Sequence, residues 1–481
     1  MQKPLKWYDA ITTNVYFFAL STRSNIMTPL LLPLLIQQFM GEETKGTAYG
    51  NLRLYSLMIA LLVQALSGML SDLSTHKWGK RRPFILSSSI LEIIGFVGVG
   101  VIAGTMSGEA GYYTLFAVTL LSMVTSNWGH GPAQGLIPDL VPPSKRGMYS
   151  GIKALFEVPL PLIFVSFVAS KMITAGNYWG AILTLIAVYV VSTGLTMLVK
   201  ETPQKEAPHP MDWGAIGRLG VMTLAFTAVI LVLGFGVRQV VPVLAANLTP
   251  AKTLLIGLIG VAAMVIAVGI GVIVSLNISL GSEAKKSPSF TWWVINRLAF
   301  LVGASNLASF VLYFVQERFP ELSGNAAAKP ASTLMMIVGV ALLVSSLPAG
   351  WLSDKFGTKK LMVAAGLLAA IGTLVVIFSP STSIMYGGGF LVGLGIGIFY
   401  SANWAMGTTL IPKDQAGRYL GLSNLAGAGS GAIGAYIGGP IGDSVGYVLL
   451  MGIYGLLFFF SILALTRIKE PGKVEADAIA S

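Results

Sequence analysis

The chain has 481 residues, of which 54% are hydrophobic and only 11% charged, and its mean hydropathy is +0.76. A soluble domain has about 25% charged residues, so this composition excludes a soluble protein and predicts a helical protein that crosses a membrane many times. The net charge of +11 does not indicate nucleic-acid binding, because the cations lie in short turns between apolar segments. With no cysteine and three scattered histidines, we expect no disulfide, no metal site and no cofactor.

Fourteen apolar segments are each long enough to cross a bilayer as a helix, which takes about 20 residues. They lie at 11–38, 50–72, 83–105, 112–134, 148–173, 177–199, 215–242, 252–279, 290–318, 332–353, 360–379, 384–408, 418–440 and 446–467. The start of the chain lacks a small-residue cleavage site, which predicts a retained first span. Lysine and arginine concentrate in alternate turns, which places both termini in the cytoplasm. We expect a multi-pass protein of the plasma (inner) membrane.

Positive charge is dense in the turn between the second and third spans. Gly68-Met69-Leu70-Ser71-Asp72 ends one apolar segment, and Trp78-Gly79-Lys80-Arg81-Arg82-Pro83-Phe84-Ile85-Leu86 leads into the next. Five groups that are or can be cationic lie here: His76, Lys77, Lys80, Arg81 and Arg82. Such charge belongs in a cytoplasmic turn, and the glycine and serine before Asp72 allow another helix to approach closely.

The second half of the chain repeats this pattern. Gly350-Trp351-Leu352-Ser353-Asp354-Lys355-Phe356-Gly357-Thr358-Lys359-Lys360 is a shorter version of the charged turn. A second pair of markers follows each copy: Asn127-Trp128 precedes Pro138-Asp139 and Arg146, and Asn403-Trp404 precedes Pro412 and Arg418. Two markers in the same order in both halves indicate an internal duplication, which is typical of transporters whose site lies between the repeats.

The two charged turns resemble the signature turns of the major facilitator superfamily, and the run from Trp78 to Leu86 is similar to the sucrose and glycoside–cation symporter branch. The resemblance implies an all-α membrane fold of two six-helix bundles. Two of the fourteen spans are then extra, and since the second turn should follow helix eight, they are 215–242 and 252–279. The predicted parts are an N-terminal bundle (1–199), a cytoplasmic linker with an inserted hairpin (200–289), a C-terminal bundle (290–469) and a cytoplasmic tail (470–481).

Polar side chains inside the spans are the candidates for the substrate site, because such groups are costly in a membrane unless they have a function or a partner. Arg23 lies near the middle of the first span among five polar neighbours, before Pro29 and Pro33, which predicts a breakable helix. In the superfamily, helices one, four, seven and ten line the cavity, and amides and aromatic rings suit neutral polyols. The predicted substrate-binding residues are Arg23, Asn25, Asn127, Trp128, Asn306, Asn403 and Trp404. The alternative for these residues is helix–helix packing.

Two carboxylates lie within spans and are candidates for proton coupling. Glu157 precedes Pro159 and follows Lys153 by four residues, and Glu92 lies in the third span. Either could take up a proton, because burial favours the neutral form of a carboxylate. The alternatives are a salt bridge of Glu157 with Lys153 or Arg146, and a contact of Glu92 with the basic turn.

The signature turns predict a cytoplasmic gate. Asp72 could contact the eleventh helix near Arg418, Asp354 the fifth helix near Arg146, and Asp139 could pair with Arg146, Arg81 or Arg82. We expect these contacts to close the cytoplasmic side and to break when the halves rock. The predicted gate residues are Gly68, Asp72, Gly79, Arg81, Arg82, Asp139, Arg146, Gly350, Asp354, Gly357, Lys359 and Arg418.

The sequence holds no nucleophile–base set and no phosphate-binding glycine loop, so we do not expect an enzyme. The first hypothesis is a secondary transporter that imports a sugar, glycoside or similar polar solute by alternating access. Its partners are the small molecule, a coupling ion and membrane lipid. Sucrose symporters carry an arginine in helix four that 120–134 lacks, and melibiose-type symporters carry acidic cation ligands in helices one and two, where this chain has only Asp9 and Asp72 at the ends. A proton is therefore the expected coupling ion.

Two alternatives remain open. A proton-coupled drug or metabolite exporter usually carries a Gly-Pro-Gly-Gly-like motif in helix five, and 155–167 lacks it. The other is a non-transporting membrane assembly factor on the same fold, against which the polar residues of the cavity helices argue.

Overall fold

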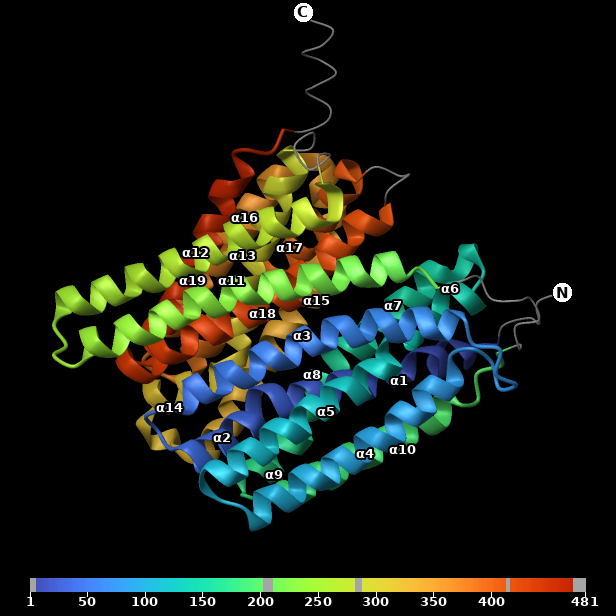
Figure 1. Cartoon of the computed structure of the whole chain (residues 1–481), viewed down its shortest axis with the longest axis horizontal. Helices are drawn as coiled ribbons and strands as arrows, with labels where there is room; N and C mark the ends of the chain where they lie inside the picture. The colour runs from blue at the N-terminus through green and yellow to red at the C-terminus, as the bar shows by residue number, and fades with distance from the viewer. Residues whose placement is uncertain (1–5, 202–210, 282–287, 412–415, 470–481) are drawn as a thin grey trace, which may run out of the picture. The chain divides into compact units, whose positions relative to one another are not determined.

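The computed structural model describes residues 6–201, 211–281, 288–411 and 416–469, and the regular structure of these residues is entirely helical (Figure 1). The elements of the first half are α1 (Asp9–Ile26), η1 (Met27–Leu31), α2 (Leu32–Met40), α3 (Lys45–Asp72), α4 (Arg82–Thr105), α5 (Gly108–Gln134), α6 (Leu136–Leu140), η2 (Pro143–Lys145), α7 (Arg146–Glu157), α8 (Pro159–Phe164), η3 (Val165–Ala169), α9 (Ser170–Thr174) and α10 (Tyr178–Thr196). Then follow α11 (Trp213–Ala245), α12 (Pro250–Leu280), α13 (Pro288–Ser309), α14 (Val311–Arg318), η5 (Pro320–Leu322), η6 (Gly324–Ala327), α15 (Ala328–Phe356), α16 (Thr358–Phe378), α17 (Thr382–Leu410), α18 (Ala416–Val445) and α19 (Tyr447–Leu465).

Helices occupy each of the fourteen predicted spans, but fewer of them meet the length and hydropathy expected of a membrane span. In the described residues ten helical stretches do so, and an eleventh if α13 and α14, which meet at a 60° bend, count as one span. The first span and the helices α5 and α18 carry the polar and glycine-rich stretches, which lower their hydropathy. The all-helical membrane architecture is confirmed, and the number fourteen stays a prediction.

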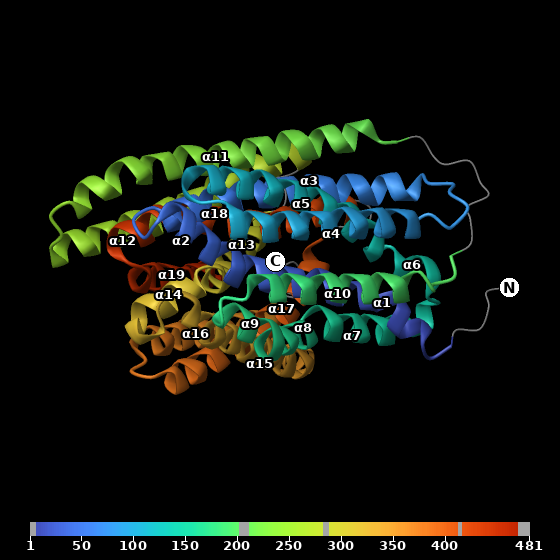
Figure 2. The ribbon, with the colours of Figure 1, turned by 90° about the horizontal axis from the view of Figure 1, so that it is seen from below.

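The contacts of the chain divide it into two compact units. Unit 1 comprises Met1–Gly41, Tyr55–Ile216 and Leu322–Ser332, and unit 2 comprises Glu42–Leu54, Gly217–Glu321 and Thr333–Ser481. Helix α3 therefore contributes its beginning to unit 2 and its remainder to unit 1. The hairpin of α11 and α12, which run side by side in Figures 1 and 2, packs within unit 2, where α12 contacts α13, α18 and α19.

Helix α1 organises unit 1, because it packs against α10, α7 and α8. Tyr16 and Phe17 on α1 join a buried cluster with Ile85 and Leu136. The first span is broken as the sequence predicts: the π-helical turn η1, which contains Pro29, interrupts it four residues after Arg23. A proline in a helix removes one backbone hydrogen bond and clashes with the preceding turn, so the break lies close to the polar group of α1.

Unit 2 contains a close helix crossing between the start of α3 and α18. Gly46 and Gly50 on α3 face Ala435 and Gly439 on α18, and a Cβ added to Gly50 would lie 2.3 Å from the carbonyl oxygen of Ala435. Small residues four apart on both helices let their backbones meet, a common way to pack helices in membranes.

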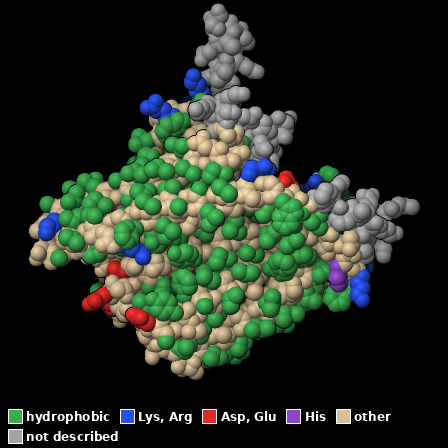
Figure 3. Space-filling view, viewed as in Figure 1, with side chains coloured by type: hydrophobic (Ala, Val, Ile, Leu, Met, Phe, Trp, Pro, Cys, Tyr) green, Lys and Arg blue, Asp and Glu red, His purple; other side chains and the backbone are tan. Residues whose placement is uncertain are grey.

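Apolar side chains cover much of the face shown in Figure 3, including that of α11, with few charged groups among them. Val221, Leu224, Val232 and Phe235 of α11 are all more than half exposed. Apolar surface of this extent needs a nonpolar solvent. Together with the run of apolar helices, it identifies an integral multi-pass membrane protein.

Candidate functional site

An arginine and a glutamate from separate helices pair in the interior of unit 1. Nε of Arg23 on α1 lies 2.7 Å from Oε1 of Glu92 on α4, and the two side chains are 8% and 0% exposed. Nη2 of Arg23 donates to Oγ of Ser122 at 2.6 Å, and Nη1 lies 4.0 Å from Sδ of Met123, both on α5. Three helices of unit 1 thus meet at this pair.

Both carboxylate oxygens of Glu92 have hydrogen-bond donors. Ser122 donates to Oε1 at 2.6 Å and Thr125 donates to Oε2, so the charge of Glu92 is held by one cation and two hydroxyls. Hydrogen bonds to a charged group are the stronger ones. Glu92 does not contact the basic turn, the alternative considered from the sequence, because it lies about 15 Å along α4 from the turn at ~1.5 Å per residue.

The other predicted substrate residues of unit 1 are occupied by local contacts. Nδ2 of Asn25 donates to the Ser21 carbonyl of its own helix at 2.9 Å, and Nδ2 of Asn127 donates to the Met123 carbonyl at 2.8 Å. Trp128 on α5 turns toward α4, where its Nε1 donates to Ser87 Oγ at 3.2 Å. These contacts favour the packing interpretation for Asn127 and Trp128.

Glu157 is the last residue of α7 and forms an ion pair with Lys153, whose Nζ lies 3.2 Å from its Oε1. The Glu157 side chain is 34% exposed. Lys153 also lies 4.3 Å from the ring centre of Phe17 on α1. The predicted Lys153–Glu157 pair is therefore formed, and Glu157 is less enclosed than Glu92.

Unit 2 holds a second polar cluster, built around Arg297 on α13. Nη1 of Arg297 donates to Oδ1 of Asn403 on α17 at 2.8 Å, and its guanidinium carbon lies 6.0 Å from the ring centres of Trp293 and Trp404. Asn403 in turn donates to Oδ1 of Asn296 at 3.2 Å. The structure brings the predicted residues Asn403 and Trp404 together through an arginine that the sequence analysis missed. The signal was available, since Arg297 interrupts the apolar segment 290–318 as Arg23 interrupts the first span.

Asn306 lies on α13 but outside this cluster. Its Nδ2 donates to the carbonyls of Val302 at 2.9 Å and Ser430 at 3.1 Å, and its side chain packs against Gly434 on α18. These bonds join α13 to α18, which favours packing as the role of Asn306.

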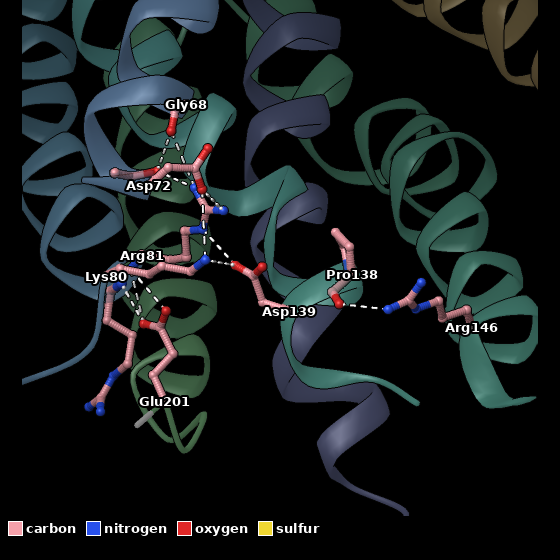
Figure 4. A network of polar contacts seen from close by, with 10 residues as sticks. Gly68, Asp72, Lys80, Arg81, Pro138, Asp139, Arg146 and Glu201 are labelled. Carbon is pink, nitrogen blue, oxygen red and sulfur yellow. Dashed lines mark hydrogen bonds and ion pairs between the residues drawn. The ribbon is translucent and has the colours of Figure 1, made fainter. Parts of the chain in front are cut away.

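The charged turn of unit 1 forms a compact network around Arg81, directly before α4 (Figure 4). Nε of Arg81 lies 2.9 Å from Oδ2 of Asp139, and its Nη2 donates to Oδ1 of Asp72. Nη1 of Arg81 also donates to the Gly68 carbonyl at 3.3 Å, and Lys80 lies 3.1 Å from Asp139. Of the three partners considered for Asp139, the structure therefore selects Arg81.

Glu201, which follows α10, closes the same network from the other side. Its carboxylate accepts the backbone N–H groups of Arg81 at 2.9 Å and of Arg82 at 3.0 Å. Gly79 has φ +102°, and a Cβ on it would lie 2.4 Å from the Cβ of Glu201, so only glycine fits this turn. Burial raises the pKa of Glu201 above its ordinary value, against the opposing effect of the two N–H groups. The sequence analysis had assigned Glu201 only to the linker.

The remaining predicted gate residues of unit 1 make backbone contacts. Nη2 of Arg146 donates to the Pro138 carbonyl at 2.8 Å, as Figure 4 shows. Arg146 thus does not form either of the ion pairs considered for it, with Asp139 or with Glu157. Nη1 of Arg82 reaches only the Trp78 carbonyl, at 3.5 Å. Arg82 is thus a peripheral member of the network.

In unit 2, the repeated turn is built differently. Gly357 has φ +91° and joins α15 to α16, while Lys359 donates to the Ile468 carbonyl at 3.0 Å. Asp354 is exposed and Gly350 half-buried. The side chain of Arg418 lies outside the described residues, so its predicted contact with Asp72 has no structural counterpart to compare.

Comparison with known proteins links this architecture to one family. Residues 298–480 match the sequence model of the Major Facilitator Superfamily. The chain is 25% identical to the Minor myo-inositol transporter IolF of Bacillus subtilis (strain 168) over 140 residues, 29% of this chain and 31% of the relative. It is 31% identical to the Multi-drug resistance efflux pump PmrA of Streptococcus pneumoniae serotype 4 over 36% of this chain and 43% of that protein. The matches thus span less than half the length of these curated relatives.

The fold itself is similar to solved transporter structures over nearly the whole chain. A D-xylose-proton symporter superposes with a TM-score of 0.63 at 15% identity, over 96% of this chain and 98% of that chain. At this identity the likeness shows a shared fold.

Proposed function

We propose that this chain, whose residues 298–480 match the sequence model of the Major Facilitator Superfamily, is a secondary transporter that moves a small polar solute by alternating access and is coupled to protons. The observation that carries the proposal is the Arg23–Glu92 pair. Ionisable groups within spans mark ion pathways or partners, and this glutamate is fully buried beside a single cation.

The pair can act as a proton-dependent switch. With Glu92 ionised, the two charges neutralise each other and hold α1 to α4. Protonation of Glu92 removes the negative charge and leaves Arg23 with only neutral partners, Ser122 and Met123. A buried charge without its partner is strongly destabilising, so the protonated state favours a rearrangement around α1, whose break at η1 lies nearby.

Glu92 is the better candidate for the proton site than Glu157. Glu157 is one-third exposed and paired with a neighbour one turn away on its own helix. Such pairs contribute only a few tenths of a kcal/mol. We propose that Glu157 supports the end of α7 at the broken fifth span.

For the solute, we propose a hydroxylated small molecule such as a sugar, glycoside or cyclitol. One relative is named for myo-inositol and one solved structure of the same fold for D-xylose. Within unit 2, Asn403 supplies a hydrogen-bonding amide and Trp404 an aromatic face for such a molecule. The run from Trp78 to Leu86 supports the sucrose and glycoside branch.

We propose that the Arg81 network is a cytoplasmic gate component, with both termini in the cytoplasm of a plasma-membrane protein. Arg81 bridges the end of α3 and the short helix α6 through Asp72 and Asp139, and Glu201 connects the segment after α10 to the start of α4. A second candidate function is proton-coupled export of a drug or metabolite, which the match to an efflux pump favours.

The test is uptake by purified protein in liposomes, with a panel of labelled pentoses, hexoses, disaccharides and myo-inositol, with and without an inward proton gradient. Accumulation of one solute that a protonophore abolishes supports the proposal. No uptake of any solute by folded protein, together with gradient-driven dye efflux from inverted liposomes, would establish the exporter instead.

A further inference from the structure

Arg297 is a cation within a membrane span that no carboxylate of the described residues neutralises. It lies about 14 Å along α13 from Pro288, at ~1.5 Å per residue. No ion pair within 4.0 Å joins Arg297 to an acidic residue in the described part of the chain, and its hydrogen bond goes to the neutral amide of Asn403.

Arg23 and Arg297 differ in the charge of their partners. Arg23 also lies within a span, but Glu92 takes up its charge and Ser122 accepts a further hydrogen bond. A carboxylate on a neighbouring helix thus neutralises Arg23, whereas Arg297 has only a neutral amide beside it among the described residues. A charged group in this environment is expected to have a partner, and a transported anion would be that partner.

The free part of the Arg297 guanidinium has a defined shape. Nη1 is engaged by Asn403, whereas Nε is buried without a hydrogen-bond partner, and Nη2 donates to no described residue. The Nε–Nη2 edge is thus open. This edge can donate two parallel hydrogen bonds to the two oxygens of a carboxylate.

The surroundings of this edge suit a molecule with a cyclic body. Trp404 and Tyr400, one helical turn apart on α17, are 49% and 42% exposed. Trp404 lies 6.0 Å from the guanidinium carbon, and Tyr400 is an electrostatic neighbour of Arg297. Exposed aromatic faces pack against the C–H faces of a ring, and a tyrosine hydroxyl can bond to a ring hydroxyl.

We propose that Arg297, oriented by Asn403, binds the carboxylate of the transported solute, and that the solute is a hydroxylated organic monoanion of the sugar-acid class. This inference rests on the proposed transport function and narrows its substrate. The single free guanidinium edge of Arg297 favours one carboxylate over a phosphate dianion, because it offers one positive charge and two parallel donors.

The test is a binding measurement that needs no transport. Purified protein in nanodiscs is titrated, at constant pH and ionic strength, with three probes that share one ring: D-glucose, D-glucuronate and D-glucose 6-phosphate. Thermal unfolding and isothermal calorimetry report binding. We expect D-glucuronate to bind about tenfold or more tighter than D-glucose, as one bidentate charged contact provides, and tighter than D-glucose 6-phosphate.

Arg297→Gln should reduce the affinity for D-glucuronate to that for D-glucose. Arg297→Lys keeps the positive charge but lacks the two parallel N–H donors, so it should lose most of the preference for D-glucuronate over D-glucose. This variant replaces Arg297→Gln in the test if the glutamine variant does not fold. Arg218→Gln, which removes an exposed arginine of α11, should keep the preference.

Two results would overturn the inference in different ways. Equal affinity of the wild-type protein for D-glucose and D-glucuronate, or a preference that persists in Arg297→Gln, contradicts the carboxylate site and leaves the proposed sugar transport standing. No binding of any probe by folded wild-type protein contradicts both.

Discussion

Arg23 on α1 and Glu92 on α4 form a buried ion pair with 2.7 Å between Nε and Oε1, 69 residues apart in the chain. Two oppositely charged groups in an apolar interior depend on each other, because each alone would be an uncompensated charge. This dependence gives the pair both a structural and a functional consequence.

The structural consequence is a strong coupling between the two residues. Arg23→Met or Glu92→Leu alone should reduce the free energy of unfolding by roughly 3–5 kcal/mol, whereas the double variant should recover most of this loss. Thermal or denaturant unfolding in detergent micelles measures the cycle. Additive losses in the double variant would show that the pair does not act as a unit.

The Arg81 network predicts a difference between two neighbouring arginines. Arg81→Ala removes the contacts with both Asp72 and Asp139. If the network closes one side of the transporter, solute exchange should become faster and gradient-driven accumulation should fall. Arg82→Ala is the matched control, since the Arg82 side chain makes a single long bond within the described residues, to the Trp78 carbonyl, and its backbone N–H bond to Glu201 is kept in the variant. Identical effects of the two substitutions would contradict a gating role for Arg81.

The crossing of α3 and α18 predicts that Gly50 cannot be enlarged. Gly50→Ala places a methyl group 2.3 Å from the Ala435 carbonyl oxygen, and a backbone atom cannot move aside cheaply. We expect a loss of about 1–3 kcal/mol in the free energy of unfolding. Gly236→Ala on α11, where a Cβ meets nothing within 4 Å, should be neutral or slightly stabilising. Thermal unfolding of both variants compares them directly.

Glu201 predicts a pH dependence of stability outside the membrane spans. Burial raises its pKa above the ordinary 4.5. Between that value and the raised folded pKa, the folded protein binds more protons than the unfolded chain, so this group lowers stability as the pH rises through that window. Glu201→Gln removes the effect.

The melting temperature of Glu201→Gln should therefore gain on that of the wild-type protein as the pH is raised from 4 toward 7. Glu109→Gln, which removes an exposed carboxylate in the first turn of α5, controls for the loss of one negative charge. A variant that instead loses stability relative to wild type with rising pH would show that the backbone N–H groups outweigh burial.

The helices of this chain could be predicted because hydropathy and charged turns are local properties. The break after Arg23 was predicted, since Pro29 and Pro33 follow it, whereas the break between Glu157 and Pro159 was not predicted although the same signal is present. The partner of Glu92 could not be predicted from the sequence. Arg23 lies 69 residues away on another helix, and spacing along one helix does not show which residues of different helices meet. Arg297 could have been predicted by the rule that identified Arg23, because it too is an arginine within an apolar segment.

Glu92 is the residue proposed to carry the coupling proton. The most direct measurement compares two activities of Glu92→Gln in liposomes, using the solute that wild-type protein accumulates: exchange of labelled for unlabelled solute without a gradient, and accumulation against a concentration difference with an inward proton gradient. If Glu92 carries the proton, Glu92→Gln, which is fixed in the neutral form, should retain exchange and lose accumulation. Accumulation by Glu92→Gln that equals wild type and is still abolished by a protonophore would contradict it.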